Sequence, residues 1–160
     1  MQLIYLAYPI LLALLTAIER TWPGWLLIYD QGPHLVVASV VGVALCAGPV
    51  AGCYGGLLGA LLLGSVNSSW LGGNFFALML LGTVVGVLRG ALLAERAPMA
   101  ALVTLAAVPI VEVIRLIFAA PPSPGPWLLQ TAVAAPYSAL VAVPVFAIFQ
   151  LVTRLLSPEP

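Results

Sequence analysis

The sequence predicts an all-α integral membrane protein, a compact bundle of about six transmembrane helices in one domain over residues 1–160. Hydrophobic residues make up 63% of the chain and charged residues 6%, whereas a soluble domain is about one quarter charged. The mean hydropathy is +1.18. Six apolar runs follow one another between short polar or proline-rich segments. Because each span needs about 20 residues, six spans leave no room for a soluble domain.

The interruptions between the apolar runs define the expected helices. The first run ends at Glu19-Arg20, and His34 precedes the second. A polar, glycine-containing turn over Asn67–Asn74 separates the third and fourth, and a stiff loop over Pro121–Pro126 separates the last two. The second run is short for a lone span, so we expect it to be tilted or buried among its neighbours. The expected spans cover residues 3–18, 35–46, 50–66, 75–93, 99–119 and 127–156.

The segment Thr21–Gly32 is amphipathic and broken, and it contains tryptophan, tyrosine and proline. Because tryptophan and tyrosine prefer the headgroup level, we expect it to be interfacial or a short re-entrant turn. Arginine placement gives the orientation: Arg89, Arg96 and Arg154 fall near the side that holds both termini. The positive-inside rule therefore predicts that both termini lie in the cytoplasm.

Small residues recur every four positions along two successive spans. The first series is Gly48, Gly52, Gly56, Ala60, Gly64 and Ser68, and the second is Gly82, Gly86, Gly90 and Ala94. Residues four apart share one face of a helix, and small faces let helices approach closely in lipid. Leu78 is bulky and is expected to close the second series. These glycines either pack the two spans together or leave a groove for the helix of another protein.

Glu112 and Arg115 are the candidate polar site within a span. They are three residues apart, so they share a helix face, and an intramembrane charge is a functional hypothesis by default. They either form a neutralised pair that orders the bundle, contact a partner, or handle protons; alternatively, Arg115 extends toward the outer surface.

Other residues give no sign of catalysis or cofactor binding. Cys46 and Cys53 lie in apolar runs and are expected to be small hydrophobic residues rather than a metal pair or disulfide. His34 has no spaced partner for a metal site. Asn67 and Asn74 are expected to cap the flanking helices. With five arginines balanced by five acids, no basic patch is present for nucleic acid. We therefore expect a non-enzymatic protein without a cofactor.

The order of the short motifs resembles the rod shape-determining protein MreD family over nearly the whole chain. The motifs are Gly32-Pro33-His34-Leu35, Gly48-Pro49-Val50-Ala51-Gly52, Trp70-Leu71-Gly72-Gly73-Asn74, Val111-Glu112-Val113-Ile114, and a last helix from Ser138 to Arg154. Leu71-Gly72-Gly73-Asn74 fits the family's most useful marker. Two positions depart from the pattern, because the family commonly has aspartate where this chain has His34 and Gly64.

The resemblance implies a non-enzymatic membrane scaffold of the bacterial cell-elongation machinery. Such a scaffold binds the single-span protein MreC within the lipid bilayer and supports the regulation of peptidoglycan synthesis. The resemblance also implies a fold like that of the substrate-binding S components of energy-coupling vitamin transporters. An S component is therefore the alternative, and Ala13 and Ala17 have the small-residue spacing with which S components dock.

Overall fold

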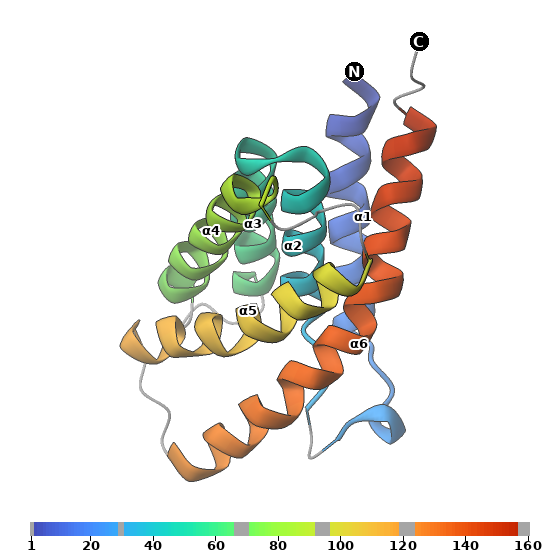
Figure 1. Cartoon of the computed structure of the whole chain (residues 1–160). Helices are drawn as coiled ribbons and strands as arrows, with labels where there is room; N and C mark the ends of the chain where they lie inside the picture. Colours follow the sequence, from blue (N-terminus) through green and yellow to red (C-terminus); the bar gives the residue numbers. More distant parts are fainter. Residues whose placement is uncertain (1, 29–30, 66–70, 92–96, 119–123, 157–160) are drawn as a thin grey trace.

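The computed structural model describes residues 2–28, 31–65, 71–91, 97–118 and 124–156. Over these ranges the chain is helical, which confirms the all-α class (Figure 1). The elements in chain order are α1 (Gln2–Arg20), the 3-10 turn η1 (Gly24–Leu26), α2 (Leu35–Ala47), α3 (Pro49–Gly64), α4 (Leu71–Leu88), α5 (Ala97–Phe118) and α6 (Pro124–Leu156).

Three of the described helices are long and apolar enough to cross a membrane by length and composition. They are α4, α5 and α6, while α2 and α3 are apolar but shorter. Large apolar side chains are exposed along the outer faces of the helices, for example Leu14 on α1 and Leu140 on α6. A water-soluble fold does not expose apolar surface on this scale, so the chain is a membrane protein.

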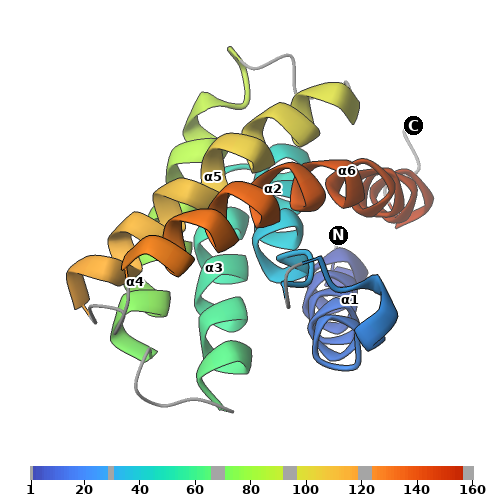
Figure 2. The same cartoon turned by 90° about the horizontal axis from the view of Figure 1, so that it is seen from below.

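The helices are inclined to one another rather than parallel. In Figures 1 and 2, α1 and the second half of α6 lie roughly along one axis with opposite chain directions, and α5 crosses them with the first half of α6 beside it. α6 changes direction within the part that holds Pro136 and Pro144, as expected for prolines inside a helix. The start of α1 and the end of α6 lie at the same end of the molecule (Figure 1).

α2 is the centre of the bundle. All residues from Leu35 to Leu45 are buried, and α2 contacts each of the other five α-helices. A helix that is apolar on every side is suited to such a buried position. The short second run is therefore buried among its neighbours, which was one of the two expected explanations for its length.

Both ends of α2 are capped by charged side chains, one from α1 and one from the turn that follows α4. At its start, the Val36 amide donates a hydrogen bond of 2.7 Å to the Glu19 carboxylate. At its end, the Arg89 guanidinium donates to the Cys46 carbonyl oxygen at 3.5 Å. An anion at the N-terminus and a cation at the C-terminus both match the helix dipole. One terminal polar group at each end of this largely buried helix thus has a side-chain partner inside the protein.

The boundaries of α4 differ from the expected ones. The helix begins at Leu71 rather than 75 and ends at Leu88 rather than 93. Leu71–Asn74, expected to be part of a turn, forms the first turn of the helix because its residues pack against α5. A Cβ atom added at Gly73 would lie 3.3 Å from the Phe118 Cβ atom. The absence of a side chain at Gly73 therefore lets the first turn of α4 pack closely against α5.

α6 begins at Pro124 rather than at residue 127. Proline is tolerated in the first turn of a helix, because the amide that it lacks would have no partner there. The remaining described helix ends lie within two residues of the expected positions. Parts of the expected elements fall on residues 66–70, 92–96 and 119–123, which lie outside the described residues; among them are Asn67, Ser68, Ala94 and Arg96.

The described part of Thr21–Gly32 lies outside the helices. None of the η1 residues is buried, and Trp25 is 82% exposed. Trp22 ties the segment to α6, because its indole N–H donates to the Tyr137 hydroxyl, which donates in turn to the Leu26 carbonyl oxygen. This exposure favours an interfacial segment over a re-entrant one.

Candidate functional site

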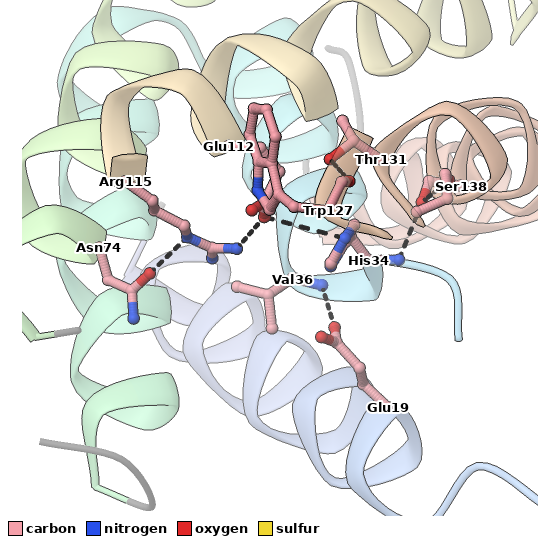
Figure 3. A network of polar contacts seen from close by, with 10 residues as sticks. Glu19, His34, Val36, Asn74, Glu112, Arg115, Trp127, Thr131 and Ser138 are labelled. Carbon is pink, nitrogen blue, oxygen red and sulfur yellow. Dashed lines mark hydrogen bonds and ion pairs between the residues drawn. The ribbon is translucent and has the colours of Figure 1, made fainter. Parts of the chain in front are cut away.

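Polar side chains from four helices and from the residue that precedes α2 come together in one network of contacts (Figure 3). We call this group the polar cluster. Its members are Glu19 of α1, His34 before α2, Asn74 of α4, Glu112 and Arg115 of α5, and Ser138 of α6. These helices are thus joined by polar contacts in addition to apolar packing.

Glu112 and Arg115 form the pair that their spacing predicts. The Arg115 guanidinium donates a hydrogen bond through one terminal nitrogen to the Glu112 carboxylate. The two side chains are only 14% and 12% exposed. The alternative in which Arg115 extends to the outer surface is therefore wrong, because the guanidinium has its partners inside the bundle.

Asn74 is the second partner of Arg115 and links α4 to α5. Its side-chain oxygen accepts a hydrogen bond of 2.7 Å from the Arg115 Nε atom. Asn74 is buried and lies in the first turn of α4, after the helix has begun at Leu71. The expected capping role is therefore wrong: the amide satisfies a buried arginine of another helix, which a local sequence pattern does not reveal.

His34 joins α2 to both α5 and α6. Its Nε2 atom lies 4.0 Å from the Glu112 carboxylate, and its backbone amide donates a hydrogen bond of 2.9 Å to the Ser138 hydroxyl. Burial lowers the pKa of the His34 imidazole; the Glu112 carboxylate opposes this shift, and Arg115 adds to it. His34 is therefore neutral near pH 7, and Glu112 has Arg115 as its charged partner.

Glu19 completes the polar cluster from the side of α1. Burial raises the pKa of its carboxyl to about 6, while the Val36 amide and Arg115 act in the opposite direction. The group therefore loses its charge at mildly acidic pH. Its carbonyl oxygen can still accept the Val36 hydrogen bond when it is protonated, although without the charge that favours the start of a helix.

The two glycine series face each other between α3 and α4. A Cβ atom built on Gly52 or on Gly82 would collide with the carbonyl group of the other residue. One built on Gly56 would collide with the Leu78 backbone, and one on Gly86 with the Pro49 backbone. The two backbones thus touch directly, and the groove is filled from within the chain rather than left for another helix.

Two details of the glycine prediction are wrong. Gly90 lies beyond the end of α4 and has no neighbour that a Cβ atom would meet within 4 Å, because the helix stops before the series does. Leu78 does not end the contact between α3 and α4. Its backbone lies directly against Gly56, and its side chain is fully buried in the core.

Three members of the polar cluster that the sequence did not connect, Glu19, His34 and Asn74, have one feature in common, which Ser138 within α6 lacks. Glu19 ends an apolar run, and His34 and Asn74 precede runs that follow it. In a chain that crosses back and forth, these positions fall on one side of the bundle. That feature places them at one end, but it does not say that they touch. In the described part of the chain, no group of three His, Cys, Asp or Glu side chains is placed to hold a metal ion.

No family model, curated protein or solved structure matches the chain. Its function is therefore inferred from the motifs and from the geometry of the polar cluster.

Proposed function

We propose that the chain is an MreD-like membrane scaffold of the bacterial cell-elongation machinery, which binds MreC and supports the regulation of peptidoglycan synthesis. It would have six spans in the inner membrane and both termini in the cytoplasm. In this proposal α1, α2 and α3 cross the membrane beside the three longer helices.

The observation that carries the proposal is the meeting of motif residues that lie far apart in the sequence. His34, Asn74, Glu112 and Ser138 come from four of the motifs that resemble the MreD family, and the polar cluster contains all four. Motifs produced by chance in apolar helices have no reason to converge on one network of contacts. The convergence supports their origin in one inherited structural unit.

The pairing of charges supports a scaffold rather than a transport relay. The Arg115 guanidinium is held by Glu112 and Asn74, and these bonds connect α4 with α5. Proton relays use a series of acids or histidines along a path, whereas these groups neutralise one another within the polar cluster. Proton flux through reconstituted vesicles that is abolished by Glu112→Gln would contradict the scaffold.

The proposed function is tested by depleting the protein in cells and by measuring two properties: the shape of the cells and the formation of the complex. Depletion should turn rod-shaped cells into spheres, and the tagged chain should co-purify with MreC from solubilised membranes. Leu140→Ala, on the exposed face of α6, serves as a folded control. Cells that stay rod-shaped, together with a chain that does not retain MreC, would contradict the proposal.

The second candidate is a substrate-binding S component. It is favoured by the exposure of Ala13 and Ala17 on the outer face of α1, where small residues would let a transporter helix approach closely. An S component would co-purify with a membrane-embedded transporter subunit and its ATPases and would support vitamin uptake. The same purification therefore separates the two candidates.

A further inference from the structure

α3 is short, and large side chains on its outer face are exposed. Its 16 residues rise about 24 Å, whereas the hydrocarbon layer of a bilayer is about 30 Å thick. Val50 and Tyr54 near its start are 69% and 66% exposed, and Leu61 near its end is 46% exposed. If α3 crosses the bilayer as proposed, acyl chains cover this face from one end to the other.

α2 is shorter still, but it does not create the same mismatch with the bilayer. Because α2 is buried along its length, protein rather than lipid surrounds it. The hydrophobic mismatch between the protein and the bilayer is therefore expected on the α3 side of the molecule.

Two exposed arginines mark the two ends of α3: Arg20 at the end of α1, and Arg89 in the turn after α4. Arg20 donates a hydrogen bond of 3.2 Å to the Leu63 carbonyl oxygen at the end of the helix. At the start, a Cβ atom added to Gly48 would lie 3.1 Å from an Arg89 guanidinium nitrogen. Gly48 and Leu63 are separated by a rise of about 22 Å along the helix, so the guanidinium groups enclose an apolar band thinner than the bilayer.

Arginine side chains in membrane proteins keep their charged heads at the phosphate level. A guanidinium fixed at each end of α3 would attract the phosphates of both leaflets toward the helix, and the bilayer can adapt to a short apolar surface by thinning. We propose that the α3 face holds a locally thinned bilayer, with Arg20 and Arg89 contacting lipid phosphates of opposite leaflets. This inference rests on the part of the proposed function in which α3 crosses the membrane, but not on the binding of MreC.

The first test measures membrane depth at two positions on α3. Val50→Cys and Leu61→Cys, in a chain without the native cysteines Cys46 and Cys53, carry nitroxide labels in reconstituted vesicles. Leu140→Cys and Leu151→Cys on α6 form the matched pair, because they are also exposed and equally far apart in sequence. A thinned bilayer places both α3 labels near the phosphate level, while at least one α6 label lies deep.

The second test compares phosphatidylcholine bilayers with chains of about 14 to about 22 carbons. The melting temperature of the wild-type protein should be highest in the shorter lipids. Arg89→Leu and Arg20→Leu should shift that optimum toward longer chains, whereas Arg154→Leu, on the exposed end of α6, should not. Should a leucine variant fail to fold, the lysine variant at the same position retains the cation and is expected to keep the short-chain optimum.

Two results would overturn the proposal. One is a deep position for either α3 label in vesicles of ordinary thickness. The other is a wild-type stability optimum in long-chain lipids that the arginine substitutions leave unchanged.

Discussion

Most charged side chains in the described part of the chain have a partner within the protein, and these partners are often backbone groups. Glu19 and Arg89 cap the ends of α2, and Arg20 caps the end of α3. Glu112 and Arg115 bind each other. Each of these five charged side chains has a definite structural partner. Replacing any one of them should therefore have a measurable effect on the free energy of unfolding.

The free energy of unfolding should depend on pH through Glu19. Its pKa is about 6 in the folded protein, against an ordinary glutamate value of 4.5, so the folded state binds the proton more tightly. Stability from this group is therefore greatest below about pH 4.5 and falls as pH rises through about 6, by up to about 2 kcal/mol at 1.36 kcal/mol per pKa unit. Glu19→Gln should remove this slope in unfolding measurements in detergent.

His34 gives the control for this measurement, because its slope has the opposite sign. A lowered pKa means that the folded state resists protonation, so stability falls as pH decreases below the ordinary value of 6.5. In the Glu19→Gln variant, the free energy of unfolding should therefore decrease as the pH falls below 6.5, because only His34 contributes. In the His34→Gln variant, it should decrease as the pH rises through about 6, because only Glu19 contributes. Identical pH profiles for the wild type and both variants would contradict the assigned burial of these groups.

The Glu112 and Arg115 pair should show energetic coupling. Glu112→Gln leaves a largely buried arginine with weaker partners and should cost about 1.5–3 kcal/mol, the range for hydrogen bonds to charged groups. Glu112→Gln combined with Arg115→Gln should recover much of this loss, which a double-mutant cycle measures. Additive losses would show that the two side chains act separately.

At the scale of helices, the closest contact is the one between α3 and α4. Backbone meets backbone at Gly52 and Gly82, so no flexible side chain can move aside to accommodate a substitution. Such contacts provide the van der Waals attraction that holds helices together in lipid.

Gly56→Ala should therefore destabilise the protein by about 1–3 kcal/mol, the range for overpacking. The matched control is Gly72→Ala, because Gly72 is also helical but a Cβ atom there would meet nothing within 4 Å. That change should be neutral or stabilise by up to about 1 kcal/mol, since alanine favours a helix. Thermal unfolding of both variants checks the prediction, and equal melting temperatures would mean that the Gly56 face does not contact α4.

For the whole molecule, the proposed topology is directly testable. Six spans place the start of α6 and the segment after its end on opposite sides of the membrane. Cysteines introduced at Gly125 and at Ser157, in a chain without its native cysteines, should react with impermeant reagents from the outside and the inside, respectively. Labelling of both positions from one side would contradict six spans.

The helical class and most element boundaries follow from the sequence, because helix formation in lipid depends on runs of apolar residues and on the prolines and polar residues between them. The four-residue spacing of Gly52, Gly56, Gly82 and Gly86 likewise indicates two small helix faces. The i, i+3 spacing places Glu112 and Arg115 on one helix face and makes their pairing one of the expected alternatives, which the structure then selects.

Only the tertiary structure decides which faces and which ends meet. The position of α4 against α5 makes Asn74 a partner of Arg115, and the packing of α1 against α2 makes Glu19 a cap for a helix that begins 16 residues after it. Local sequence patterns report neighbours along one helix, whereas these contacts join residues whose separation in the chain carries no information about distance. The polar cluster is therefore a product of helix packing, and the sequence alone contains only its separate members.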